Sequence, residues 1–125
     1  MNNETISILI TDDSILLRKQ LKDILQYNGC RNFIEASNGQ EAIDKFKASR
    51  PNLIFLDIVM PVKDGITATK EIREIDPDAY IVVISSLGTQ TQLQEALAAG
   101  VKAFIQKPLR PEQIVDVLAR SLEGR

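Results

Sequence analysis

The segment Asn52-Leu53-Ile54-Phe55-Leu56-Asp57-Ile58-Val59-Met60-Pro61 contains a short, continuous apolar run that ends at an aspartate. An apolar run without polar alternation is typical of a strand that is buried on both faces, as the strands of parallel sheets are. Comparable runs occur at Ile6–Ile10, Tyr80–Ile84 and Ala103–Ile105, and Phe33-Ile34 resembles a shorter edge strand. The sequence therefore predicts five strands at regular intervals along the chain.

Apolar residues at helical spacing separate these runs. The periodic groups are Leu17, Leu21, Ile24 and Leu25; Ala42, Ile43 and Phe46; Ala68, Ile72 and Ile75; Leu93, Ala96 and Leu97; and Ile114, Val117, Leu118 and Leu122. Two capping boxes are predicted, at Asn38-x-x-Glu41 and Thr91-x-x-Gln94, with Pro111 at a first helical position and Gly29 and Gly100 at helix ends. Right-handed crossovers then place the helices on both faces of a parallel sheet, an α/β fold of five β-α units.

Length and composition limit the possible functions. The 125 residues fit one domain, predicted over residues 1–125. The net charge of −2 argues against the basic surface that nucleic-acid binding requires. The apolar runs are far shorter than the roughly 20 residues of a membrane helix, which predicts a cytoplasmic protein. Histidine is absent, so triads that depend on it are excluded, and the only cysteine, Cys30, is expected to be a packed core residue.

Polar residues stand where four of the predicted strands stop. They are Asp12, Asp13, Asp57, Ser85 and Lys107. The carboxyl ends of parallel strands share one edge of the sheet, where ligands bind in open α/β folds, so we expect these side chains to lie close together. Carboxylates gathered without a cation repel one another, and oxygen ligands of this type suit Mg²⁺. The pattern favours a magnesium-dependent phosphoryl chemistry.

Asp57 is the candidate nucleophile, because a carboxylate can attack phosphorus to form an aspartyl phosphate. Asp13, Asp12 through a water, and a backbone carbonyl just after Asp57 are the candidate Mg²⁺ ligands, while Lys107 and Ser85 are candidate partners of the phosphoryl group. Each residue also has a simpler interpretation. Asp12-Asp13 can cap a helix, Asp57 can be a turn residue, and Ser85-Ser86 can be a cap or loop pair. A lysine before a proline is usually solvated. Their joint position at the strand ends favours the functional interpretation.

These residues resemble the receiver domain of two-component response regulators over about Ile6 to Leu122. The matching motifs, in family order and spacing, are Thr11-Asp12-Asp13, Leu56-Asp57-Ile58-Val59-Met60-Pro61, Asp64-Gly65, Ile84-Ser85-Ser86 and Lys107-Pro108. The resemblance implies a flavodoxin-like doubly wound sheet with strand order 2-1-3-4-5.

The resemblance also implies a role for each site residue. Asp57 would be the phosphorylation site, Asp12 and Asp13 the acidic pair, and the Val59 carbonyl a further Mg²⁺ ligand. Ser85 would be the switch hydroxyl, Phe104 the switch aromatic residue, and Lys107, followed by a cis peptide bond to Pro108, the phosphate partner. Such a protein is a phosphoacceptor in signalling rather than an enzyme with its own substrate.

Within the family, the chain resembles stand-alone, CheY-like chemotaxis regulators. That resemblance implies a CheA-like histidine kinase as phosphodonor, a flagellar switch protein as target, and a separate phosphatase. The phosphatase is expected because Val59 and Leu87, two residues beyond Asp57 and Ser85, are apolar where polar side chains often tune hydrolysis. Neither side chain can orient an attacking water, which predicts slow self-dephosphorylation.

Two other hypotheses about the function of the chain stay open. The first is an intermediate phosphorelay receiver that passes its phosphoryl group to a histidine phosphotransfer protein. The second is a pseudo-receiver that binds partners without being phosphorylated. A flavodoxin-like redox protein and an aspartate-dependent phosphatase are disfavoured, because an FMN phosphate loop and an acid two residues after Asp57 are missing.

Overall fold

The fold is seen in a computed structural model that describes residues 1–86 and 88–123. Over these residues the strands form one parallel sheet in the order β2-β1-β3-β4-β5. The strands are β1 (Ser7–Thr11), β2 (Asn32–Ala36), β3 (Leu53–Asp57), β4 (Ile81–Ser85) and β5 (Ala103–Gln106). The helices are α1 (Ile15–Tyr27), α2 (Gly39–Ser49), α3 (Gly65–Ile75), α4 (Gln90–Ala99) and α5 (Pro111–Glu123). The predicted flavodoxin-like α/β fold and its strand order are confirmed.

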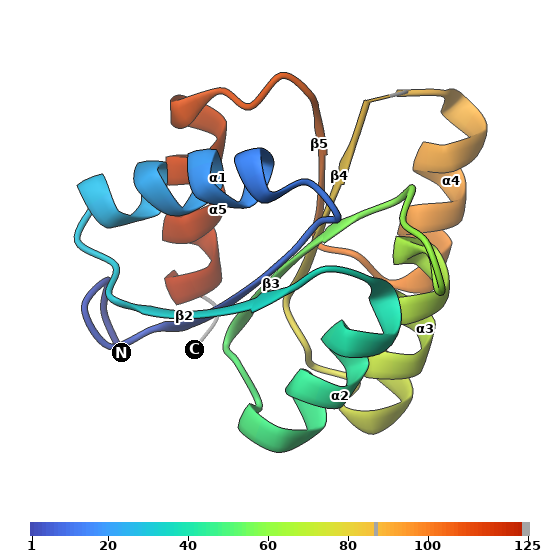
Figure 1. The fold of residues 1–125 in the computed structure, drawn as a ribbon, viewed down its shortest axis with the longest axis horizontal. Coiled ribbons are helices and arrows are strands. Elements are labelled where there is room, and N and C mark those ends of the chain that lie inside the picture. The colour runs from blue at the N-terminus through green and yellow to red at the C-terminus, as the bar shows by residue number, and fades with distance from the viewer. Residues whose placement is uncertain (87, 124–125) are drawn as a thin grey trace.

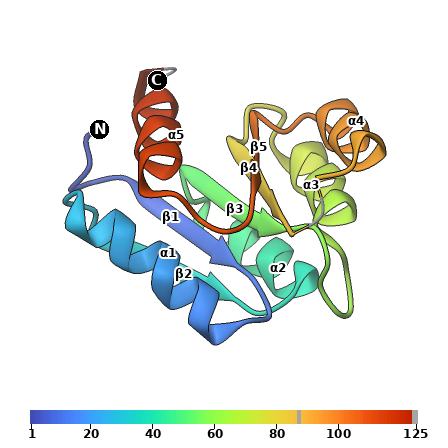
Figure 2. The same cartoon turned by 90° about the horizontal axis from the view of Figure 1, so that it is seen from above.

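Helices cover both faces of the sheet, as Figures 1 and 2 show. α1 and α5 lie on one face, and α2, α3 and α4 lie on the other. Residues along β1 alternate between the two faces, as the two-residue period of a strand requires. Ile8 and Ile10 pack with Leu21 of α1 and Ile114 of α5, whereas Leu9 belongs to the core on the opposite face. The sheet thus separates two apolar cores, and Cys30 is buried in the α1–α5 core as expected.

Four strands extend one residue closer to the carboxyl edge than the apolar runs suggest. The last residues of β1, β3, β4 and β5 are Thr11, Asp57, Ser85 and Gln106. Their backbone groups take part in the sheet, where Asp57 pairs with Ile84 and Ser85 pairs with Gln106. Asp57 and Ser85 are therefore held by the sheet ladder itself. The edge strand β2 is likewise longer than the predicted Phe33-Ile34.

The helix caps agree with the sequence at Asn38 and differ at α4. Asn38 caps α2, accepting a hydrogen bond from the Glu41 amide at 2.8 Å. The capping box predicted from Thr91 is wrong, because α4 begins two residues earlier and Thr89 is its cap. The Thr89 hydroxyl accepts from the Gln92 amide at 3.2 Å. Gly29 and Gly100 follow helix ends with φ of +94° and +101°, a conformation that glycine adopts without a Cβ penalty.

The helices α4 and α5 are anchored to very different degrees. Four residues of α5 are buried, namely Ile114, Val117, Leu118 and Ser121. In α4 the buried residue is Ala96, while Leu97, predicted to face the core, is 55% exposed. Since apolar burial is the main attraction between a helix and its sheet, α4 is held less firmly than α5.

Among residues 1–86 and 88–123, the helices are all too short and too polar to cross a membrane.

Candidate functional site

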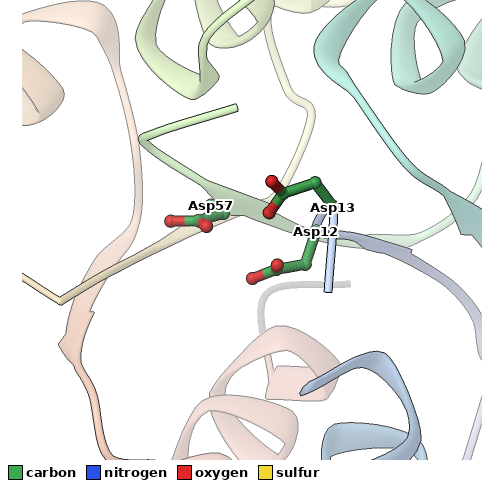
Figure 3. A group of neighbouring side chains, drawn as sticks. All are labelled: Asp12, Asp13 and Asp57. Carbon is green, nitrogen blue, oxygen red and sulfur yellow. The ribbon is translucent and has the colours of Figure 1, made fainter. Parts of the chain in front are cut away.

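Three aspartates meet at the carboxyl edge of the sheet, as predicted (Figure 3). Asp12 and Asp13 lie between β1 and α1, and Asp57 ends β3. One carboxylate oxygen from each lies within 4.8 Å of the others. Asp12 and Asp57 are buried, whereas Asp13 is exposed and gives the group an opening to solvent.

The ammonium group of Lys107 lies against two of these carboxylates. Its Nζ is 3.2 Å from Asp57 Oδ2 and 3.3 Å from Asp12 Oδ2. The side chain comes from the segment after β5, and the Lys107–Pro108 peptide bond is cis, as the family resemblance implied. Burial lowers the pKa of Lys107, but the carboxylates of Asp57 and Asp12 outweigh it, so that the pKa is raised above its ordinary value and the cation persists.

The carboxyl group of Asp57 has an unusual affinity for protons. Burial is the main cause, and the neighbouring Asp12 carboxylate adds to it, so the pKa of Asp57 is raised to about 6 although Lys107 opposes the shift. A buried carboxylate beside another one is destabilised as an anion unless additional positive charge is nearby. The site is therefore suited to an additional cation.

Asp12 is oriented by Ser14, the cap residue before α1, and by Arg18 in the first turns of α1. Its Oδ1 accepts a hydrogen bond from the Ser14 amide at 2.8 Å, and its backbone carbonyl accepts from Arg18 Nη1 at 2.6 Å. The helix cap of α1 is Ser14, whose hydroxyl accepts from the Leu17 amide. The alternative in which Asp12-Asp13 supplies the cap is thus wrong, and the two aspartates can serve the site.

The backbone of Asp57 is packed against the first residue of α3. A Cβ placed on Gly65 would lie 2.2 Å from the Asp57 carbonyl oxygen, far inside van der Waals contact. A Cβ on Gly39 would likewise meet the Lys63 carbonyl oxygen at 2.2 Å, and the Gly39 amide donates to that oxygen at 3.0 Å. The loop between β3 and α3 is thereby fixed at both ends. Between these ends Val59 and Val62 are 60% and 80% exposed.

Ser85 lies on β4, which pairs with β3, and Phe104 lies on β5, which pairs with β4. Ser85 is buried at the end of β4, its carbonyl accepts from the Lys107 amide at 2.8 Å, and its hydroxyl donates to Gln92 Oε1 at 3.3 Å. Phe104 of β5 is half-buried and packs against the core on the α2–α4 face. Ser85 thus lies at the same edge of the sheet as Lys107 and its two carboxylate partners. Phe104 lies on the side of the sheet that α4 covers.

Sequence reasoning missed two residues that shape the site, Arg18 and Gln92, and it named Gly65 only as part of a motif. Arg18 also pairs with Glu35 of β2 at 3.1 Å, and a basic residue one turn after the Ser14 cap is the signal that could have suggested it. Gly65 stands in the Asp64-Gly65 motif, where its closeness to the Asp57 backbone requires the fold to be known. Gln92 carries no signal, because glutamine in the first turn of a helix is common.

The chemistry of the donor set fits Mg²⁺. This ion prefers carboxylate oxygens and keeps several waters, and the site offers three carboxylates of which one is exposed to solvent. Lys107 alone leaves the group with net negative charge. A carboxylate at the end of a strand, next to a lysine and a divalent cation, can receive a phosphoryl group.

A sequence profile of the response regulator receiver domain matches residues 8–119. The chain belongs to the response regulator receiver family. Receiver domains are signalling domains rather than conventional enzymes, and they bind Mg²⁺ at the acidic pocket that Asp12, Asp13 and Asp57 form here.

The relatives narrow the family membership to CheY-like receivers. Chemotaxis protein CheY of Bacillus subtilis is 43% identical over 92% of this chain and 96% of its own length. Chemotaxis protein CheY of Thermotoga maritima is 45% identical over 89% of this chain and 92% of its own length. A chain in the crystal structure of the CheX-CheY-BeF3-Mg²⁺ complex from Borrelia burgdorferi has a TM-score of 0.89 and 34% identity, covering 94% of this chain and 89% of that one. The chain is a CheY-like receiver, as expected for a chemotaxis response regulator.

Of the two apolar residues that predict slow self-dephosphorylation, Val59 projects into solvent and Leu87 lies outside the described residues. Slow self-dephosphorylation stays a prediction.

Proposed function

We propose that residues 1–125 act as a single receiver domain that accepts a phosphoryl group on Asp57 and thereby switches the binding of a chemotaxis partner. The observation that carries this proposal is the geometry around Asp57, whose Oδ2 is 3.2 Å from Lys107 Nζ and whose carboxylate lies next to those of Asp12 and Asp13. A structural ion pair would need neither the second buried carboxylate nor the exposed third one.

In the proposed reaction, a carboxylate oxygen of Asp57 attacks phosphorus of the donor. A bond between phosphorus and Asp57 forms as the bond between phosphorus and the leaving group breaks, and the leaving group takes the electron pair. Lys107 is close enough to donate hydrogen bonds to the phosphoryl oxygens as their charge shifts, and no other covalent step is required.

We further propose that Asp12, Asp13, Asp57 and the Val59 carbonyl hold Mg²⁺. When bound, the ion supplies positive charge that offsets the repulsion between Asp57 and the phosphoryl oxygens. The position of Asp12 in this set is fixed by the Ser14 amide, which contacts its carboxylate, and by Arg18, which contacts its backbone carbonyl.

The switch couples the phosphoryl group to the surface around α4 and β5. Ser85 Oγ and Lys107 Nζ move toward the new phosphoryl oxygens, and Phe104 turns inward as that hydroxyl leaves its place. Exposed polar residues surround this face, namely Thr89, Gln90, Gln94, Lys102 and Gln106. A partner that reads this face binds weakly before phosphorylation and more strongly after it.

The partners follow from the chemotaxis assignment. A CheA-like histidine kinase supplies the phosphoryl group, and a flagellar switch protein is the target. The protein acts in the cytoplasm and binds neither nucleic acid nor a membrane. A phosphatase is the third proposed partner, because the exposed, apolar side chain of Val59 cannot orient an attacking water. The solved complex of CheX with a CheY similar to this chain supports a further protein partner. The names of the relatives support this assignment over a phosphorelay intermediate, and the intact group around Asp57 argues against a pseudo-receiver.

The test is intact-protein mass after incubation with acetyl phosphate and Mg²⁺. The native chain should gain one phosphoryl group, and Asp57→Asn should gain none. Asp44→Asn, at an exposed position on α2, is the matched control and should be modified like the native chain. Modification of Asp57→Asn to the same extent, or no gain in the native chain, would refute the proposal.

A further inference from the structure

Gln92 connects the first turn of α4 to the end of β4. Its Oε1 accepts a hydrogen bond from Ser85 Oγ at 3.3 Å, and its backbone amide donates to the Thr89 hydroxyl at 3.2 Å. Gln92 is half-buried, while the neighbours Gln90, Thr91 and Gln94 are exposed. The side chain of Gln92 is thus turned toward the site.

The partner of Gln92 is a hydroxyl that has only one proton to donate. A serine hydroxyl carries a single O–H, so a strong bond from Ser85 Oγ to a phosphoryl oxygen on Asp57 takes that proton away from Gln92 Oε1. The two acceptors compete for it. Because the sheet fixes the Ser85 backbone through its pairing with Gln106, the competition is decided by rotation of the side chain.

The weak anchoring of α4 makes this hydrogen bond consequential. Ala96 is the buried residue of α4, and it lies one turn beyond Gln92. The first turn is therefore fastened by the Thr89 cap and the Ser85–Gln92 hydrogen bond rather than by burial of large apolar side chains. A helix end with so little burial responds to the loss of a single hydrogen bond.

We propose that Gln92 is a positioning residue that holds the Ser85 hydroxyl in the unphosphorylated protein, and that phosphorylation releases the first turn of α4 by taking this hydroxyl away. The inference rests on the proposed function, in which Ser85 moves to the phosphoryl group. It adds a chain-specific acceptor for the unphosphorylated state and a direct route from Asp57 to α4.

The Ser85–Gln92 hydrogen bond stabilises the state without the phosphoryl group, so it must weaken binding of anything that recruits Ser85. Beryllofluoride with Mg²⁺, which takes the place of a phosphoryl group on an aspartate, is the probe. The net contribution of one hydrogen bond corresponds to a change of about two- to tenfold in this affinity.

The experiment measures by isothermal titration calorimetry how tightly beryllofluoride with Mg²⁺ binds to four proteins. These are the native chain, Gln92→Met, Gln92→Glu and Gln113→Met. Gln92→Met keeps length and flexibility but loses the amide, and should bind about two- to tenfold more tightly than the native chain. Gln92→Glu should bind more weakly, since a carboxylate accepts a stronger bond from Ser85 and repels the anion. Gln113→Met is the matched control, because Gln113 is exposed and is likewise the third residue of its helix, and it should bind like the native chain.

A second background separates positioning from general stability. In Ser85→Ala, the substitution Gln92→Met should no longer change the affinity, because the hydrogen bond is already gone. An equal change in both backgrounds, or an unchanged or weaker affinity for Gln92→Met in the native background, would overturn the inference while leaving the proposed function intact. Failure of the native chain to bind beryllofluoride would overturn both.

Discussion

Helices α4 and α5 flank the same strand, β5, but the protein uses them differently. α5 buries Ile114, Val117 and Leu118 against the sheet, whereas α4 buries Ala96 and leaves Leu97 largely exposed. α4 instead reaches the carboxyl edge through Gln92, whose side chain accepts a hydrogen bond from Ser85. The comparison teaches that one helix contributes mainly to the stability of the fold, while the other can change its position at small cost.

The most direct way to break this comparison is to truncate one leucine in each helix. Leu118→Ala in α5 should lower the free energy of unfolding by about 2–5 kcal/mol, because it leaves a cavity at a residue that is 2% exposed. Leu97→Ala in α4 should change it by no more than about 0.5 kcal/mol. Urea titrations followed by circular dichroism measure both. Equal losses would show that α4 is anchored as firmly as α5.

Removal of the α4 cap sharpens the comparison at one helix end. Thr89→Ala removes the acceptor of the Gln92 amide and should cost about 1 kcal/mol of helix stability. Because α4 is weakly packed, the loss should appear as faster hydrogen exchange of α4 amides, with those of α5 unchanged. Ser14→Ala, which removes the corresponding cap of α1, is the control and should leave exchange in α4 unaffected. A uniform acceleration across α4 and α5 would contradict the idea of a separately mobile helix.

Ligand binding tests the same contrast without a mutation. Addition of beryllofluoride and Mg²⁺ should alter the exchange of amides in the first turn of α4 by several-fold and leave α5 within error. Chelation of Mg²⁺ by EDTA should reverse the change, since the anion and Asp57 then repel each other. Larger changes in α5 than in α4 would show that α5 is the helix that moves, which contradicts the proposed role of α4.

The smallest expected effect concerns the surface of α5. Asp116 and Arg120 form an exposed ion pair at 3.0 Å, one turn apart. Asp116→Asn should change the free energy of unfolding by less than about 0.5 kcal/mol, since exposed pairs of this kind contribute little. A loss above 1 kcal/mol in urea titrations at moderate salt would mean that surface charge, as well as the apolar core, holds α5 in place.

Much of the fold could be predicted because apolar runs and helical periods report on burial. The strand order came from the family resemblance, and the meeting of Asp12, Asp13, Asp57 and Lys107 followed from the rule that parallel strands share a carboxyl edge. The apolar runs end one residue short of the strands, since Asp57 and Ser85 are polar residues that the sheet nevertheless includes. Burial of a carboxylate at a strand end is unfavourable without a partner, so a pattern based on hydrophobicity cannot anticipate it.

Two predictions about α4 are wrong, each for its own reason. Thr91-x-x-Gln94 has the spacing of a capping box, but Thr89 has the extended backbone of a cap and starts the helix earlier. Leu97 follows the helical period, yet it is exposed because α4 meets the sheet mainly through a small residue, Ala96. The Ser85–Gln92 contact depends on where α4 begins, so it could not be found before the helix start was known.

The glycine contacts around the loop between β3 and α3 have a consequence for sequence change in this protein. Gly39 and Gly65 touch carbonyl oxygens so closely that any larger residue would displace the backbone of the loop or of Asp57. Val59 and Val62, between these fixed ends, project into solvent and can be exchanged without disturbing the core. Side chains at Val59 and Val62 can therefore change while the backbone around Asp57, Gly39 and Gly65 stays constant. Descendants of this chain can acquire new partners or phosphoryl lifetimes in this way without a change in the position of Asp57.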